Sequence, residues 1–314
     1  MKRTSAALLL IALTGCGGGG SPSRPSNATP APTSTTFAVV SGESDAPVGG
    51  ATIVLAGATL TSDASGHVAV QPPPAAGSLV DIIAPGFLDR QTLVRRGMAI
   101  YTLWPRTSPP GLTEDFTSRI VYTDSGDDNA DVGGSGLERL RNGTSQAFVV
   151  ASASIQSDGP AMAMHDAAVG EINSMLAGAL SYALVTQAAS GSVAFEARLD
   201  PADPDCAPDI RGFASLSLRG GEIVSGRIVY CSKDAARAST VTHELGHTLG
   251  LQHSPNDHEL MAPFFARQRS TRFSAREGLA VALMLQRRGG NRFPDNDRDA
   301  TTSARSGTVV IRCQ

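Results

Sequence analysis

The segment that most constrains the fold holds three histidines within eleven residues. His243 and His247 are four residues apart, so on a helix they share one face and can point at the same metal ion. His253 cannot join them from a continuing helix, because it would stand at a different height and angle. Gly250 can end a helix in the left-handed conformation without steric penalty. The segment therefore predicts a helix that ends near Gly250 and a chain that turns back to bring His253 to the same metal.

Glu244 stands directly after the first of these histidines. One position along a helix is a rotation of about 100°, so its carboxylate points toward a water molecule at the metal and not toward the metal itself. A catalytic zinc ion keeps an open position beside three protein ligands and lowers the pKa of a bound water to about 7. We therefore expect Glu244 to act as a general base.

The residues from His243 to His253 read H-E-L-G-H-T-L-G-L-Q-H. This order resembles the zinc-binding segment of the metzincin peptidases. Ser254, the next residue, is typical of their matrixin group. Residues 259–263 resemble the Met-turn that lies beneath the zinc in metzincins, with Met261 at its centre and Pro263 placed as in matrixins.

The resemblance covers roughly residues 113–290. It implies a zinc-dependent endopeptidase that hydrolyses internal bonds of protein or peptide substrates. It also implies one catalytic Zn²⁺ held by His243, His247 and His253, and a catalytic role for Glu244. The implied fold is α+β, a mixed twisted sheet with an active-site helix. The alternative is a cell-surface binding protein or adhesin with a catalytically silent metzincin domain, and the intact Glu244 favours the enzyme.

The chain also departs from parts of the metzincin pattern. Residue 263, two positions after Met261, is not a tyrosine, so the tyrosine ligand of astacins and serralysins is not expected. No PRCGxPD-type cysteine motif precedes the domain, so the thiol latency of matrixins is not implied, and Cys206 is a poor candidate for it. His165 is the only histidine upstream in this domain, and we expect it at the surface or at a helix cap.

The first residues are typical of an exported lipoprotein. Lys2 and Arg3 precede an apolar run at residues 6–13, which is too short to span a bilayer. The run ends in Leu-Thr-Gly before Cys16, which resembles a bacterial lipobox, and Gly17 favours the outer membrane by the same resemblance. An ordinary signal peptide with an incidental cysteine is the alternative. We expect a lipid anchor on Cys16, a flexible Gly/Ser/Pro tether at residues 16–36, and an outer-membrane location facing the periplasm or the cell surface.

Three cysteines follow Cys16. Disulfides persist in the oxidising compartment that an exported chain enters. Cys206 and Cys231 lie in one domain, in a loop and at a strand end, and are the more plausible pair. Cys313 is then left over, and the sequence does not settle the pairing.

Residues 37–104 read as short strands between Gly, Pro and Asp, at the spacing of a small β-sandwich. Residues 46–51, 63–66 and 84–87 resemble the carboxypeptidase regulatory-like domain, a transthyretin-like sandwich that implies a spacer or binding platform. We assign it no chemistry. Three prolines at residues 105–111 predict a linker.

Beyond the linker the apolar periodicity changes, which predicts both strands and helices. We expect strands at residues 118–122, 146–155, 193–199, 213–218 and 223–230, and helices at 161–187, 233–249 and 275–286, the last one entered through Ser274. The expected domains are a signal peptide at 1–15, a tether at 16–36, a sandwich at 37–104, a peptidase domain at 113–290 and a tail at 291–314.

Two remaining signals are weak. Residues 295–299 begin like a calcium loop, but Ala300 and Ser306 replace the Gly and Glu of that motif, so a Ca²⁺ site has little support and a solvated acidic loop is favoured. The net charge of −3 and the absence of a basic block argue against a nucleic-acid partner. Nothing in the sequence names the substrate.

Overall fold

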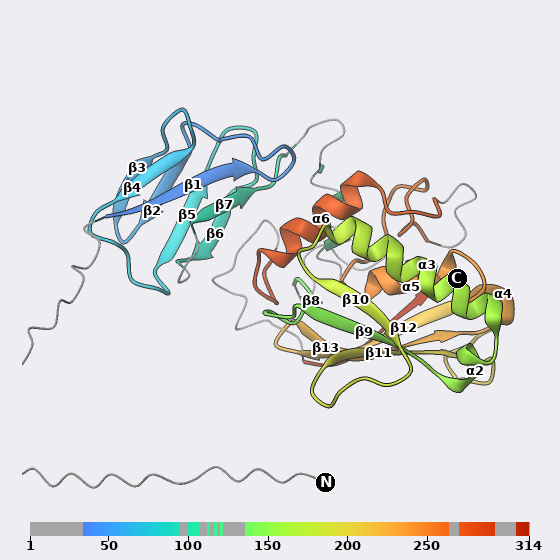
Figure 1. The fold of residues 1–314 in the computed structure, drawn as a ribbon. Helices are drawn as coiled ribbons and strands as arrows, with labels where there is room; N and C mark the ends of the chain where they lie inside the picture. Colours follow the sequence, from blue (N-terminus) through green and yellow to red (C-terminus); the bar gives the residue numbers. More distant parts are fainter. Residues whose placement is uncertain are drawn as a thin grey trace, which may run out of the picture. The chain divides into compact units, whose positions relative to one another are not determined.

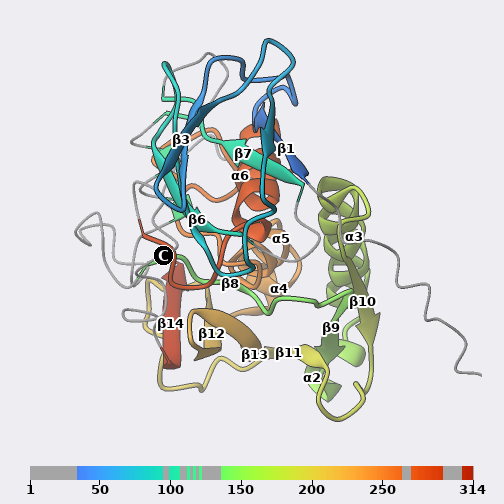
Figure 2. The same ribbon diagram turned by 90° about the vertical axis from the view of Figure 1, so that its left-hand side faces the viewer.

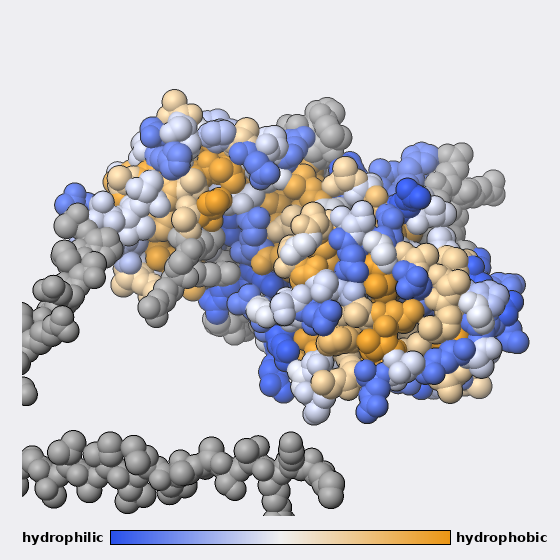
Figure 3. Space-filling view, in the orientation of Figure 1, coloured by the Kyte–Doolittle hydropathy of each residue, from blue (hydrophilic) through white to orange (hydrophobic). Residues whose placement is uncertain are grey.

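The computed structural model describes residues 34–94, 99–106, 112–113, 116–117, 120–121, 136–263, 270–292 and 306–313. The chain divides into two units, residues 1–32 and 33–314, and the description below concerns the second. The expected signal peptide, the lipidated Cys16, most of the linker and the acidic loop at 295–299 lie outside the described residues. Among the described helices, none is long and apolar enough to cross a membrane. In Figure 3, apolar residues gather near the middle of the visible face of the larger domain, with hydrophilic residues around them.

Residues 35–103 form two small sheets with a core of their own (Figure 1, blue to teal). The first has the order β4-β1-β7, with β1 at Thr35–Ser41, β4 at His67–Val70 and β7 at Ile100–Leu103. The second has the order β3-β2-β5-β6, with β2 at Thr52–Leu55, β3 at Ala58–Thr61, β5 at Leu79–Ile83 and β6 at Arg90–Leu93. Alternate residues of β1 and β2 are buried, as period-two side-chain placement requires. Phe37, Val39, Ile53 and Ile82 lie in their shared core.

The second domain is built on a seven-stranded sheet of order β10-β9-β11-β13-β12-β14, with β8 (Arg139–Leu140) paired to β13. The strands are β9 (Gln146–Ala151), β10 (Ser181–Val185), β11 (Val193–Leu199), β12 (Gly212–Arg219), β13 (Glu222–Tyr230) and β14 (Gly307–Cys313). Strands β10, β9, β11 and β13 are parallel, whereas β12 is antiparallel to both β13 and β14. The sheet is mixed, as expected for a metzincin-type domain.

Strand β14 comes from the segment that the sequence assigns to a tail. It runs along β12 at the edge of the sheet (Figure 2). The side chains of Val309, Ile311 and Cys313 are buried, and those between them are more exposed. This alternation is the pattern of a half-buried strand, and pairing with β12 is what makes residues 307–313 part of the domain.

The expected long helix at 161–187 is shorter in the structure. Helix α3 spans Gly159–Leu176, begins at its N-cap Asp158 and ends at Ala177, whose φ is +46°. Gly178 also has a positive φ, so the backbone leaves the helix there. The remaining residues turn back as β10. Two smaller corrections lie nearby: the end of the expected strand at 146–155 is the short helix α2 (Ala153–Gln156), and Ile120 and Val121 are helical instead of extended.

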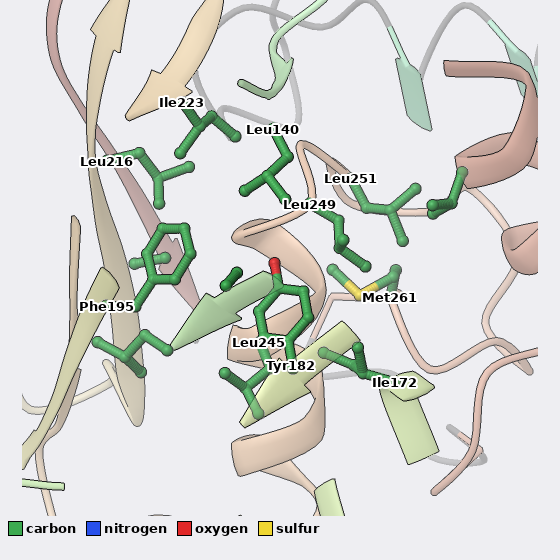
Figure 4. Packing of buried hydrophobic residues seen from close by; sticks show 14 of the residues in the cluster. Leu140, Ile172, Tyr182, Phe195, Leu216, Ile223, Leu245, Leu249, Leu251 and Met261 are labelled. Atoms are coloured by element: carbon green, nitrogen blue, oxygen red, sulfur yellow. The ribbon is translucent and has the colours of Figure 1, made fainter. Parts of the chain in front are cut away.

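The expected helix at 233–249 is divided into α4 (Lys233–Ala236) and α5 (Thr240–His247). Helix α5 lies with α3 on one face of the sheet (Figure 1). Leu245 of α5, and Leu249 just after the helix, fill the space between the sheet residues Phe195 and Leu216 and the loop residue Met261 (Figure 4). Burying these side chains fixes the orientation of the opposite face of α5.

The last expected helix is confirmed as α6 (Ala275–Leu285). Ser274 is its N-cap, and Glu277 completes a capping box with it.

Candidate metal centre and active site

Helix α5 places His243 and His247 one turn apart on a fully buried face. Their ring centroids are 4.9 Å from each other. Between them, Gly246 lies against the Met-turn, since a Cβ added there would collide with the Sδ atom of Met261. The absence of a side chain at this position therefore lets the helix approach Met261 closely.

After α5 the chain turns back at Gly250, which has a φ of +103°. A Cβ at this residue would run into the carbonyl oxygen of Glu138, so both the backbone conformation and the space require glycine. The turn brings His253 to the other two histidines, with ring centroids 5.4 Å from His243 and 5.1 Å from His247. The structure thus brings together the three histidines that the sequence singles out.

Backbone carbonyls fix the ring orientation of the two helical histidines. The Nδ1–H of His243 donates to the Leu260 carbonyl at 2.7 Å, and that of His247 to the Leu251 carbonyl at 2.6 Å. A carbonyl oxygen only accepts, so Nδ1 carries the proton and Nε2 keeps a lone pair for a metal. Metal-binding histidines commonly have this second hydrogen bond. The donor set and its orientation therefore fit a zinc ion.

Cys313 is the residue that the sequence analysis missed. Its Sγ lies 3.4 Å from Nε2 of His247 and 3.5 Å from Nε2 of His253. The ligand atoms of the three histidines and Cys313 all lie within 4.8 Å of one another. Two signals in the sequence were available: a cysteine left over after the plausible disulfide, and the alternation of Val309, Ile311 and Cys313.

Glu244 is fully buried beside the first residue of β12. A Cβ on Gly212 would lie 3.1 Å from its Oε1, so the carboxylate lies directly against the backbone of that strand. Burial and then the charge of Glu244 raise the pKa of the Tyr230 hydroxyl well above its usual value, which places this phenol near the carboxylate as well.

Two hydrogen bonds donated by backbone N–H groups hold the loop from His253 to Met261. The N–H of Ser254 donates to the Met261 carbonyl at 2.7 Å, and the N–H of Met261 donates to Oε1 of Glu277 at 2.7 Å. Burial raises the pKa of Glu277 to about 7, although the backbone N–H groups that donate to its carboxylate lower this pKa. Helix α6 therefore holds the Met-turn in position through one buried carboxyl group.

Glu259 ties the same loop to α6 through side chains. Its carboxylate accepts hydrogen bonds from the hydroxyl of Ser254 at 2.6 Å and from that of Ser274 at 3.0 Å. The Nε of Arg276 donates to it at 3.0 Å. Ser254, which the sequence marks only by its resemblance to matrixins, thus has a physical role in the loop.

His165 is not at the surface and does not cap a helix. Its side chain is fully buried, its Nδ1 lies 2.7 Å from the Ala161 carbonyl, and its ring meets Tyr230 edge-on at 5.2 Å. Burial lowers its pKa. The helical periodicity of α3 explains this placement, because His165 lies on the same face as the buried Ala161, Ala168 and Ile172.

Cys206 and Cys231 form a disulfide, with Cα atoms 5.4 Å apart. It links the loop before β12 to the end of β13. Cys313 is not part of this bridge and keeps its thiol.

A match to a family model agrees with this site. None of the curated proteins matches the sequence. Residues 173–278, which include α5, the three histidines and Met261, match the family model described as Matrixin. Together with the cluster of His243, His247 and His253, this match supports a matrixin-like catalytic domain of the zinc metallopeptidase class in this chain.

Proposed function

We propose that the chain is a zinc-dependent endopeptidase that hydrolyses internal peptide bonds, with His243, His247 and His253 as protein ligands and Glu244 as the general base. One observation supports it most: two histidines with correctly oriented Nε2 atoms and a third from the returning chain meet beside a buried carboxylate.

Bound zinc would polarise the scissile carbonyl and lower the pKa of the attacking water. The protein supplies the other parts of the reaction. The Leu260 and Leu251 carbonyls hold the two helical imidazoles in the orientation that leaves Nε2 for the metal. Glu244 takes the proton of the attacking water and can pass it to the leaving amine. Because this carboxylate is fully buried, its interaction with the transferred proton is stronger than it would be in water.

The test is cleavage of an untargeted peptide library by the full chain, with and without a zinc chelator. We expect internal cleavage that the chelator abolishes and added zinc restores, with about one zinc per chain. In a chain that also carries Cys313→Ala, His253→Ala should lose most of the zinc, since only two protein ligands then remain. A protein that binds zinc but cleaves nothing in the library, even after the changes at Cys313 described below, would contradict the proposal and favour a binding role.

We also propose that Cys16 carries a lipid anchor that holds the protein in a bacterial outer membrane, and that the two sheets of residues 35–103 form a regulatory-like sandwich that separates anchor and peptidase. The short apolar run, the following tether and the motifs at 46–51 and 63–66 support this. Intact-mass analysis of the membrane fraction should show added acyl mass that Cys16→Ala abolishes. A soluble protein with an unmodified N-terminus would contradict the anchor.

A further inference from the structure

Strand β14 occupies the edge of β12 next to the active site. The register pairs Cys313 with Gly212 and continues, strand against strand, to Gly307 opposite Leu218. Gly212 is the residue whose backbone lies against the Glu244 carboxylate. This pairing therefore places the side chain of Cys313 at the histidine cluster, close to Glu244, the proposed general base.

The position of the thiol fits coordination to the same ion. With zinc–nitrogen bonds of about 2.05 Å and a zinc–sulfur bond of about 2.3 Å, tetrahedral geometry places sulfur and nitrogen roughly 3.6 Å apart. The distances from Sγ to His247 and His253 are 3.4 and 3.5 Å. Four protein ligands close a zinc site, as in structural zinc sites, whereas catalytic sites keep one position open.

The backbone of β14 adds a second obstacle. An extended peptide binds a sheet by adding a strand to its edge, which supplies main-chain hydrogen bonds and directs alternate side chains to pockets. The edge nearest Glu244 is that of β12, and β14 lies along it from Gly212 to Leu218. A substrate that paired with this edge would take the place of β14.

We propose that Cys313 is a fourth zinc ligand and that β14 is an intramolecular inhibitor, which fills both the open coordination position and the peptide-binding edge. The proposal rests on the zinc peptidase function above. Displacement of β14 then converts a closed four-ligand site into a catalytic one.

Contacts along β14 hold this closed state in place. Val309 and Ile311 are 2% and 0% exposed in the domain core. The N–H of Arg211 donates to the Cys313 carbonyl at 2.9 Å, and Arg312 pairs with Asp205 at 2.7 Å. The Arg312 pair is half exposed and contributes little. Burial of the two apolar side chains is the main barrier to release.

The ligand is tested directly by zinc K-edge X-ray absorption on the zinc-loaded full chain. The wild type should show a sulfur shell at about 2.3 Å beside nitrogen at about 2.0 Å. Cys313→Ala should keep one zinc and lose the sulfur shell. Thr308→Ser, an exposed change in the same strand, should keep it. A nitrogen- and oxygen-only shell in the wild type would show that the thiol merely hydrogen-bonds to the imidazoles, and would overturn the proposal.

Inhibition is tested by peptide cleavage with the same proteins and with a chain lacking residues 307–314. Cys313→Ala opens the coordination position but leaves β14 docked through Val309 and Ile311, so it should cleave faster than the wild type. The truncation also exposes the β12 edge and should cleave faster still, at least about tenfold above the wild type if fewer than about one wild-type molecule in ten has β14 released. Its folding is checked by zinc content and thermal melting, and Cys313→Ala remains informative if the truncation fails to fold.

The outcomes separate this proposal from the proposed function. If neither variant cleaves faster than an active wild type, β14 is not an inhibitor, although the peptidase stands. If all forms bind zinc and none cleaves, the peptidase function is wrong. A sulfur shell in the wild type would in that case still support Cys313 as a zinc ligand, but not β14 as an inhibitor. If the wild type binds no zinc, both proposals are overturned.

Discussion

The backbone N–H of Met261 donates a hydrogen bond to the buried carboxyl of Glu277, so the first turn of α6 supports the loop beneath the histidine cluster. The same carboxyl accepts the N–H of Ser274 at the start of its own helix. A single side chain therefore both caps α6 and fixes the Met-turn.

This arrangement predicts a pH-dependent stability. The pKa of Glu277 rises from 4.5 to about 7 on folding, so the folded chain binds more protons than the unfolded chain between these values. The free energy of unfolding should therefore fall as the pH rises from about 5 to 8, by on the order of 3 kcal/mol at most from this group. Glu277→Gln, which keeps a capping residue at this position, should remove that slope. Denaturant unfolding at several pH values checks it, and an unchanged slope would contradict the assignment.

The buried His165 should make the stability depend on pH with the opposite sign. Burial lowers its pKa below 6.5, so the unfolded chain binds more protons than the folded chain below that pH. Stability should consequently decrease as the pH falls below about 6.5, because the buried imidazole must become charged. His165→Phe keeps an aromatic ring against Tyr230 and should flatten this acid limb of the unfolding curve. If acid sensitivity is the same in the variant, other groups are responsible for it.

Adding a side chain at Gly246 should disturb the packing of α5 against Met261. Gly246→Ala would push a methyl group into the Sδ atom of Met261 and should destabilise the domain by about 1–3 kcal/mol and weaken zinc binding. Gly170→Ala is the matched control, because Gly170 lies in α3 with nothing within 4 Å of the added Cβ. That change should stabilise by about 0.5–1 kcal/mol. Thermal melting and zinc titration distinguish the two, and equal effects would argue against close packing of α5 on Met261.

Removing the Glu244 carboxylate should slow cleavage without loss of the bound metal. Glu244→Ala should keep the zinc content and reduce cleavage by about 10²–10⁴, the usual contribution of a positioned general base. The comparison is made in the Cys313→Ala background, where the proposed thiol ligand is absent. His258→Ala, an exposed histidine of the following loop, is the control and should change neither quantity. Zinc lost in proportion to activity would instead indicate that the carboxylate orients a ligand.

The histidine segment was predictable because its geometry is local. Spacing by four residues and a glycine break restrict the positions of His243, His247 and His253 whatever surrounds them. Ser274 and Glu277 likewise indicate the start of α6, because their spacing is that of a capping box.

Other features depended on contacts that are distant in the sequence. The apolar periodicity of α3 continues past Leu176, and only the left-handed Ala177 and the pairing of β10 with β9 end the helix there. The burial of His165 needs Tyr230 from another strand. Cys313 becomes part of the site only through a strand pairing with β12, which local patterns in residues 307–313 do not specify.

The pairing of β14 with β12 also has a consequence for the order of folding. Strands β12 and β13 are adjacent in the chain and close through a short hairpin between Arg219 and Glu222, and the three histidines lie within one continuous segment. Cys313, in contrast, is 66 residues from His247. Closing so long a loop costs more chain entropy and is reached later. During refolding we therefore expect a period in which the histidine cluster exists and β14 has not yet docked, and in that period a newly made chain can acquire its metal.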